Sequence, residues 1–295
     1  MNSETVMTLP NCNELLLDLD DGVLNLTLHR PHKRNAMNSA MVIELMAVFE
    51  SIQGNRTIRA VVIRGAQGNF CAGGDISDMS QDSKQGSESS PEPSSSKLDS
   101  SKLDSSKLDS SKLRDAIWHF NRSFGTLITK VNRAPQLVIC ILEGAVLGGG
   151  FGLACISDVA IAKPDAMFAM PETGLGIIPA QIAPFVVARI GLTQARRLTL
   201  LGERLDGHAA LALGIVHHVT DDVEAELARN LKIFNKCAPN ATAVTKQLVL
   251  DVAERSGMEP LLDRASDDFS KAMLSDEGQE GTTAFIQKRK PSWCN

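Results

Sequence analysis

The sequence lacks the patterns that mark several classes of protein. Its 295 residues include six cysteines but no CxxC pair, which argues against a disulfide framework or a metal site and favours a reducing compartment. The formal net charge of -5 predicts no general attraction to nucleic acid or to an anionic lipid surface. The N-terminus has no basic segment before a long apolar run, and no window approaches the roughly 20 apolar residues of a membrane span. We therefore expect a cytoplasmic protein without a signal peptide, a bound metal, a nucleic-acid partner or a membrane partner.

Two phosphate-binding motifs are also absent, although the chain contains glycine-rich loops. The longest such run is Gly148 to Gly150. No Lys-Ser or Lys-Thr follows it, as a P-loop would require, and its spacing does not supply the GxGxxG of a dinucleotide fold near a first strand. The glycine run therefore needs another explanation.

The pattern that is present predicts strand–helix–strand units followed by helices. Apolar residues make up 43% of the chain, which is enough for a large core. Helices are expected after Asn38 or Ser39 and over about 117–131, and helical spacing dominates beyond about residue 193. Strands are expected at 22–29, 60–65, 136–142 and 158–162.

The segment 81–113 differs in composition from the rest of the chain. SSKLD occurs three times in tandem over 95–109 and is followed by SSKL. The five-residue period fits neither a helix nor a strand, and serine dominates the segment. We predict a low-complexity, disordered or mobile insert, with a partner-docking segment as the alternative.

Two glycine loops, each after an expected buried strand, are the candidate functional elements. Gly73 and Gly74 follow 60–65, and the run from Gly148 follows 136–142. The start of a helix leaves backbone N–H groups without partners and carries partial positive charge. Such a site suits a phosphate or the oxygen of a carbonyl that becomes an enolate, whereas close packing of a helix on a sheet is the alternative for one loop alone. Two loops can aim one N–H each at a shared oxygen.

One carboxylate stands among apolar residues and glycines downstream of these loops. It is Glu172, in the stretch PETGLGIIP over 171–179. Desolvation there would raise its pKa towards the range that is useful for proton transfer. An acid beside a polarised carbonyl indicates proton chemistry at the adjacent carbon.

The chain resembles the crotonase (enoyl-CoA hydratase/isomerase) superfamily over almost its whole length, apart from 81–113. The matching motifs are RPHKRNAMN, FCAGGDISDM, EGAVLGGGFGLACISDVAIA, FAMPETGLGIIP and AFIQKRKPSW. The resemblance implies an α/β fold: a spiral of repeated ββα units with the coenzyme A site over 1–200, then a helical trimerisation region over 201–295. It implies a homotrimer or a dimer of trimers, an acyl-CoA thioester substrate, and no cofactor, since coenzyme A is part of that substrate.

The same resemblance implies the roles of individual residues. Gly74 and Gly149 would supply the two peptide N–H groups that hold the thioester oxygen, and Glu172 would transfer the proton. Six positions would contact coenzyme A: two in a basic loop, two through their backbone, and two from the C-terminus of a neighbouring subunit. These are Lys33, Arg34, Ala36, Ala72, Phe285 and Lys288. A solvated surface is the alternative for the lysines and arginines.

The chain departs from the hydratase pattern at one position. Typical hydratases of the family carry a first glutamate just after the glycine run, and here that position is Gly152. A Δ3,Δ2-enoyl-CoA isomerase, which works with one glutamate, is therefore an alternative, as is a non-catalytic acyl-CoA-binding scaffold. A dienoyl-CoA isomerase is disfavoured because the second acid that it needs is Ala180 here.

Two stretches, LEGAVLGGGFGLA and PETGLGIIPAQIAPFVVARIGLTQARRL, resemble the isohexenylglutaconyl-CoA hydratase branch of the family. That resemblance implies hydration of a branched 2-enoyl-CoA, a 3-substituted glutaconyl thioester with a free carboxylate of its own. This carboxylate, or Glu143 at a strand end, would help to orient water, although a structural hydrogen bond is the alternative for Glu143. In the loop that carries Gly73 and Gly74, Cys71 is expected to be a small apolar filler, and Asp75 is expected to stabilise the loop.

Overall fold

A computed structural model describes residues 9–75, 102–253, 269, 271 and 275–293. Its main sheet has six strands in the order β1-β2-β3-β4-β6-β8. β1 pairs antiparallel with β2, and the other neighbours are parallel. The bounds are β1 (Leu15–Asp20), β2 (Val23–Leu28), β3 (Ala60–Gly65), β4 (Leu137–Leu142), β6 (Val159–Ala162) and β8 (His218–Val219).

A second, smaller layer of extended chain runs beside the main sheet. β5 (Ala145–Leu147) and β7 (Met167–Ala169) pair in parallel in this layer. Isolated bridges extend it: Met37 with Gly74 and Cys71 with Val146 pair in parallel, and Phe168 pairs antiparallel with Leu205. After each parallel strand of the main sheet up to β6, the chain therefore adds a short extended segment to this second layer.

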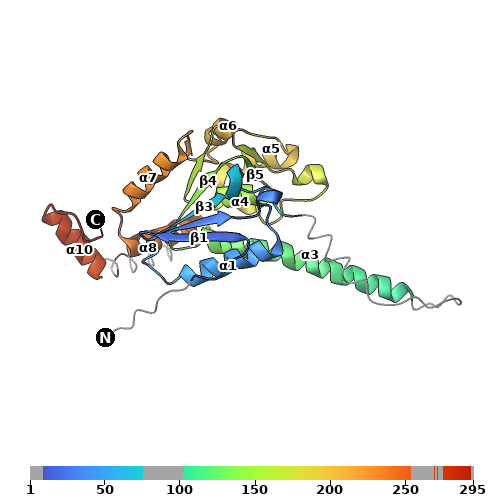
Figure 1. The fold of residues 1–295 in the computed structure, drawn as a ribbon, viewed down its shortest axis with the longest axis horizontal. Helices are drawn as coiled ribbons and strands as arrows, with labels where there is room; N and C mark the ends of the chain where they lie inside the picture. Colours follow the sequence, from blue (N-terminus) through green and yellow to red (C-terminus); the bar gives the residue numbers. More distant parts are fainter. Residues whose placement is uncertain (1–8, 76–101, 254–268, 270, 272–274, 294–295) are drawn as a thin grey trace.

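A helix follows each of these extended segments, so the repeating unit is ββα. The four helices are α1 (Ser39–Ile52), α3 (Lys102–Asn132), α4 (Gly149–Ile156) and α5 (Ala183–Leu201). Figure 1 shows α1 and α3 running along the same side of the sheet, with α4 and α5 near the β5 end. The predicted α/β spiral of ββα units is confirmed.

The C-terminal part of the described chain is mainly helical, as expected. It contains α6 (Gly207–Ala212), α7 (Val223–Phe234), α8 (Pro239–Ala253) and α10 (Asp276–Ile286), with β8 as an addition to the sheet. The division of the chain at residue 200 stays a prediction, and α5 ends beside it at Leu201. Within the described ranges, none of the helices combines the length and the hydropathy that a bilayer crossing requires.

Apolar side chains cover both faces of the sheet, because parallel strands between helices are buried on each side. Leu24, Leu26 and Leu28 of β2 are fully buried in the larger cluster, together with residues of α1, α3 and α4. Val223 and Leu227 of α7 pack against the opposite face. The alternation read from 22–29 is therefore confirmed.

The antiparallel strand β1 was not among the expected elements. Asp21 and Gly22 connect it to β2, and both residues have positive φ angles, of 43° and 75°. A two-residue Asp-Gly turn of this kind matches the twist of a β-hairpin. The Asp-Gly pair in LLLDLDDGVLNLTL was the signal for this strand.

The expectation for the serine-rich repeats is partly wrong. The residues 102–113, which carry repeats, belong to α3, and the earlier part of the predicted insert lies outside the described residues. Residues 102–113 contain no glycine or proline. Extending a helix that is already formed adds one hydrogen bond per ordered residue, which is far cheaper than starting one. The five-residue period therefore did not prevent a helix from continuing through these repeats.

Candidate active site

The two glycine loops and the predicted acid meet at one cavity of about 150 Å³. Gly74, Gly149 and Glu172 all line it. The rest of the wall comes from α3, from the start of α1 and from the segment 171–182. The three residues predicted to act together are therefore brought together by the fold.

Gly74 presents its N–H group away from its neighbouring strand. Met37 N donates to Gly73 O at 2.8 Å, and Asp75 N donates to Met37 O at 2.9 Å. In such a parallel bridge, both bonds to Met37 come from the residues that flank Gly74, so the Gly74 amide is not used. Among the described residues, the Gly74 N–H has no hydrogen-bond acceptor.

Gly149 presents a second amide at the start of α4. It is the first residue of that helix, where a backbone N–H has no partner within the helix. The preceding Gly148 has a φ of +48°, which disfavours any side chain, and its N–H bonds to Ala169 O at 3.1 Å. A Cβ at Gly148 would lie 3.6 Å from Gly73 Cα and 3.0 Å from Glu172 Oε1. The two loops and the acid therefore touch.

Glu172 is a desolvated carboxyl without a counter-charge. It begins the short 3-10 helix η3 (Glu172–Leu175), and its Oε2 is buried with no hydrogen-bond partner among the described residues. Burial raises the pKa of Glu172 above its ordinary value, and a hydrogen bond from its own backbone opposes part of that rise. The direction agrees with the expectation from the sequence, because both follow from desolvation.

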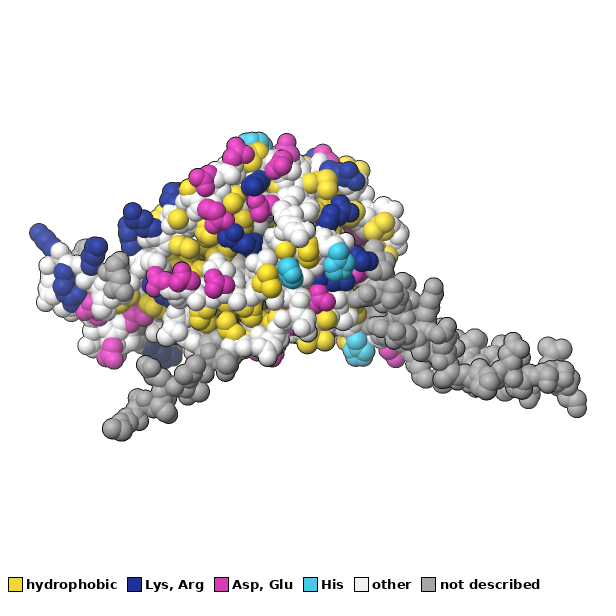
Figure 2. All heavy atoms as spheres, viewed as in Figure 1, with side chains coloured by type: hydrophobic (Ala, Val, Ile, Leu, Met, Phe, Trp, Pro, Cys, Tyr) yellow, Lys and Arg dark blue, Asp and Glu magenta, His cyan; other side chains and the backbone are white. Residues whose placement is uncertain are grey.

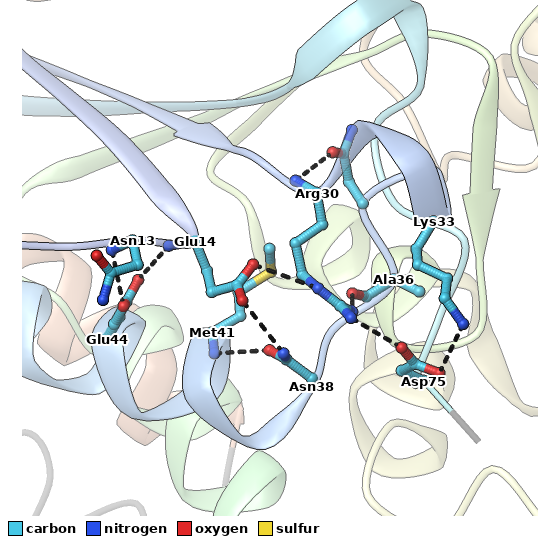
Figure 3. Close-up of polar contacts among 10 residues, drawn as sticks. Asn13, Glu14, Arg30, Lys33, Ala36, Asn38, Met41, Glu44 and Asp75 are labelled. Carbon is cyan, nitrogen blue, oxygen red and sulfur yellow. Dashed lines mark hydrogen bonds and ion pairs between the residues drawn. The ribbon is translucent and has the colours of Figure 1, made fainter. Parts of the chain in front are cut away.

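A buried arginine holds the loop that carries Gly74 (Figure 3). Arg30 Nη1 donates to Ala36 O at 2.6 Å, and Nη2 donates to Asp75 Oδ2 at 3.0 Å. Its Nε lies 3.2 Å from Glu14 Oε2, and Lys33 Nζ lies 3.9 Å from Asp75 Oδ1. Only 7% of Arg30 is exposed. The guanidinium therefore ties the residues on both sides of the Met37–Gly74 bridge, and Asp75 stabilises its loop as predicted.

Asn35 connects the same loop to the end of β3. Its Oδ1 accepts from Arg30 N at 2.9 Å, and its Nδ2 donates to Ala66 O and Asn69 O at 2.9 and 2.6 Å. Its φ of +57° lies in the left-handed region, which asparagine tolerates better than most residues. Neither Arg30 nor Asn35 was identified separately from the sequence, although an asparagine inside a polar loop was a usable signal.

The residues assigned to coenzyme A are only partly at the cavity. Ala72 lines it, whereas the other five do not. Lys33 and Arg34 are exposed, and Ala36 is buried with its carbonyl bonded to Arg30. Phe285 belongs to α10 and Lys288 follows it, so their contact with a neighbouring subunit stays a prediction.

The position of the missing first glutamate has no free space. Gly152 lies inside α4, and a Cβ there would overlap with Ile182 Cγ2 and lie 3.1 Å from Ile182 Cβ. It would also lie 3.0 Å from Ile128 Cδ1. Because Ile182 is only 3% exposed, it cannot move into solvent without cost. Packing therefore excludes a second carboxylate at this position.

Glu143 has a structural role. Its Oε1 lies 2.8 Å from Lys163 Nζ, and it is not among the residues that line the cavity. The hypothesis that Glu143 orients water is therefore wrong, and its alternative, a polar contact at the strand end, is confirmed.

Cys71 fills space between the two loops. It is fully buried, and burial raises the pKa of its thiol to about 12, so the thiol stays protonated. A Cβ at Gly150 would lie 2.7 Å from Cys71 Cβ, which shows how closely the loops pack. The expected apolar filler role is confirmed.

Several lining residues were not identified as such from the sequence. Phe120, Asn121 and Phe124 of α3 line the cavity, as does Gln181. The sequence identified 117–131 only as an amphipathic helix. An isolated glycine in that helix, Gly125, was the one signal of a close approach.

The amides of Gly74 and Gly149 have no hydrogen-bond acceptor in the part of the chain that the structure describes, and they lie beside a desolvated carboxyl in a mainly apolar cavity. This arrangement defines a site for proton transfer next to a carbonyl. The model of the enoyl-CoA hydratase/isomerase family matches residues 23–232. The chain therefore belongs to the enoyl-CoA hydratase/isomerase family, within the crotonase superfamily, and is an enzyme of that family.

Individual relatives include both hydratases and isomerases. The solved structure of Pseudomonas aeruginosa AtuE is 49% identical, with a TM-score of 0.84 over 96% of this chain and 100% of that one. The 1,2-epoxyphenylacetyl-CoA isomerase of Escherichia coli is 28% identical over 95% of this chain and 97% of its own. The short-chain-enoyl-CoA hydratase of Clostridium acetobutylicum is 29% identical over 94% and 96%.

Proposed function

We propose that the protein hydrates a branched 2-enoyl-CoA, namely isohexenylglutaconyl-CoA or a related 3-substituted glutaconyl-CoA. The observation that carries the proposal is the contact between the half-buried Glu172, whose Oε2 is shielded from solvent, and the two glycine loops. It places a group that can exchange a proton beside two amides that can hold a thioester oxygen.

A single glutamate is sufficient for this reaction. Ionised Glu172 accepts a proton from water as the water oxygen bonds to C3 of the enoyl thioester. The electron pair of the C2–C3 double bond moves to the thioester oxygen, where the N–H groups of Gly74 and Gly149 stabilise the enolate. Protonated Glu172 then donates the proton to C2. The sum is addition of H and OH, and the carboxylate is regenerated.

The same residues support a second candidate, a Δ3,Δ2-enoyl-CoA isomerase. In that reaction Glu172 would remove a proton from C2 of a 3-enoyl thioester and return it to C4 of the resulting dienolate, whose oxygen the same two amides would hold. The closed space at Gly152, where Ile182 packs, favours this alternative because no second carboxylate can position water. The free carboxylate of a glutaconyl substrate would favour hydration instead, because it would help to orient the attacking water.

We also propose a homotrimer or a dimer of trimers. Figure 2 shows acidic and basic side chains interspersed on one face, with apolar side chains exposed between them. On the rim of the cavity, Ile178 is 72% exposed, and Leu200 and Leu201 on α5 are 66% and 71% exposed. Burial of such side chains is the usual driving force for association. Light scattering coupled to size-exclusion chromatography tests the assembly.

Ultraviolet spectroscopy distinguishes the reactions. A conjugated enoyl thioester absorbs in the near ultraviolet, so hydration removes that band, whereas isomerisation of a 3-enoyl substrate creates it. Glu172→Gln should lower kcat by about 10²- to 10⁴-fold in either case. Glu143→Gln is the matched control and should retain the wild-type rate. If wild type turns over no enoyl-CoA in a panel of varied chains, and Glu172→Gln binds acyl-CoA normally, the protein is a scaffold.

The amide at Gly149 has its own test. A Cβ at this residue would lie 2.6 Å from Met37 Cε and 3.2 Å from Phe124 Cζ, so Gly149→Ala intrudes where the carbonyl would bind. We expect kcat to fall by about 10²- to 10³-fold, the usual effect of losing one oxyanion donor. Gly174→Ala is the control, because its Cβ would meet nothing within 4 Å. Equal rates in both variants would contradict a close approach of the thioester carbonyl to Gly149, because alanine keeps the N–H group and adds only the methyl group.

A further inference from the structure

Three polar side chains line the cavity within the described part of the chain, and the proposed reaction uses only one of them. The reaction uses Glu172, and the other two are Asn121 of α3 and Gln181, which precedes α5. Gln181 Nε2 donates to Asn121 Oδ1 at 2.8 Å, so the two amides form a pair. A polar pair in an apolar wall costs desolvation unless it has a polar partner.

The backbone of α3 makes room for this pair. Gly125 lies four residues after Asn121, on the same face of the helix. A Cβ at Gly125 would overlap with Gln181 Oε1 and lie 2.8 Å from Gln181 Cδ. Glycine in a helix interior costs about 1 kcal/mol relative to alanine. The glycine therefore has a packing reason: it admits the Gln181 amide against the helix.

The surroundings of the pair favour a negatively charged partner. Arg122 Nη1 would lie 3.0 Å from the same Cβ position, so a guanidinium group lies near the Gln181 amide. Among the described residues, Asn121 Nδ2 has no hydrogen-bond acceptor, and an amide N–H is a donor. No lysine, arginine or histidine of the described chain lines the cavity itself. An anionic group in the cavity could therefore accept a hydrogen bond from Asn121 Nδ2, and the positively charged Arg122 guanidinium lies beside Gln181.

We propose that Asn121 and Gln181 bind a free carboxylate on the acyl chain and select dicarboxylic acyl-CoA thioesters over plain alkyl ones. The proposal rests on the proposed function, because it assigns the second polar end of that substrate. Asn121 Nδ2 donates to the carboxylate, Gln181 fixes the Asn121 amide, and Arg122 adds attraction at longer range. Glu172 and the Asn121–Gln181 pair, which line the same cavity, then act on two different groups of the substrate.

The test measures binding with thioesters that cannot react. The probes are 3-methylglutaryl-CoA, which has the free acid, and 3,5-dimethylhexanoyl-CoA, which carries an isopropyl group of equal shape in its place. Isothermal titration should give a preference of about 10- to 100-fold for the acid, as expected for hydrogen bonds to a charged group. Asn121→Leu and Gln181→Leu should each reduce that preference to less than about 3-fold.

Two further variants separate this role from a structural one. Gly125→Ala, which displaces the Gln181 amide, should reduce the preference although alanine favours the helix. Phe120→Leu changes an apolar part of the wall and should weaken both thioesters equally, so that their ratio stays at the wild-type value. Circular dichroism confirms that each variant folds.

The outcomes distinguish the two proposals. Equal affinity of wild type for both probes overturns the carboxylate site, even if the protein hydrates enoyl thioesters. A preference that survives in Asn121→Leu and Gln181→Leu also overturns it. A preference that these variants abolish, in a protein that hydrates no glutaconyl thioester, supports the carboxylate site and refutes the hydration.

Discussion

The packing of Ile182 against Gly152 predicts an effect of mutation that changes sign with its background. Gly152 lies inside α4, where alanine is favoured over glycine by about 1 kcal/mol. The added methyl group, however, would overlap with Ile182 Cγ2 and crowd Ile182 Cβ, which is not the end of a flexible chain. Overpacking of this kind costs about 1–3 kcal/mol. Gly152→Ala should therefore lower the free energy of unfolding by about 1 kcal/mol.

Removing the obstacle should reverse that effect. Ile182→Ala alone costs about 2–5 kcal/mol, because it leaves a cavity. In this background the methyl group of Gly152→Ala fills part of the cavity, and the helix preference remains. The second substitution should then raise the free energy of unfolding by about 1 kcal/mol, which makes the coupling energy about 2 kcal/mol.

Urea unfolding of the four proteins at one fixed protein concentration measures this cycle. Gly54→Ala is the control, since its Cβ would meet nothing within 4 Å and its φ is not positive. It should give the same small change with and without Ile182→Ala. If Gly152→Ala stabilises the protein equally in both backgrounds, Ile182 does not close this position, and the absence of the second carboxylate has another cause.

The Glu172 carboxyl and the ion pair that holds the Gly74 loop make three further predictions. Because burial raises the pKa of Glu172 in the folded protein, ionised Glu172 destabilises the fold above that pKa. Glu172→Gln should therefore raise Tm at neutral pH. This increase in Tm should disappear as the pH falls through the raised pKa towards the ordinary glutamate value. The same group should give kcat/KM an acid limb centred above the ordinary glutamate pKa, measured in a pH–rate profile, and a limb at or below it would contradict the desolvation argument. Arg30→Met leaves buried Asp75 without its main partner and should cost about 3–5 kcal/mol in urea unfolding, whereas a loss under 1 kcal/mol would show that the ion pair is dispensable.

The repeating part of the fold could be predicted because its signals are local. The alternation in β2 and the apolar run in β4 indicate strands without any knowledge of their neighbours. Asn38 caps α1 by accepting from Met41 N at 2.9 Å, as its position before the helix suggested. The glycine loops were recognisable because glycine is disfavoured in both helices and strands. Resemblance then added which amides and which acid act together.

The contacts that shape the acyl pocket could not be predicted in this way. Gln181 and Asn121 are 60 residues apart, and only the fold brings them together. Ile182 closes the space at Gly152 from a position 30 residues further along the chain, in the segment before α5. Such contacts depend on how two elements are placed relative to each other, and the local sequence around either residue does not predict that placement. The helix at 102–113 was not predicted for a related reason. These residues are helical because they continue the helix that runs to Asn132, and their own five-residue period does not indicate this.

The raised pKa of Glu172 requires that the positive charge of Arg30 be balanced by carboxylates that contact its guanidinium. An unneutralised cation beside the Glu172 carboxyl would lower its pKa and oppose the effect of its burial. Arg30 lies before the loop residue Met37 that pairs with Gly74, and its guanidinium carries a positive charge. Glu14 and Asp75 neutralise its guanidinium within 3.2 Å. The same ion pairs that fix the Gly74 amide thus limit the positive field of Arg30, so that loop rigidity and a proton-exchanging acid are compatible in one small cavity.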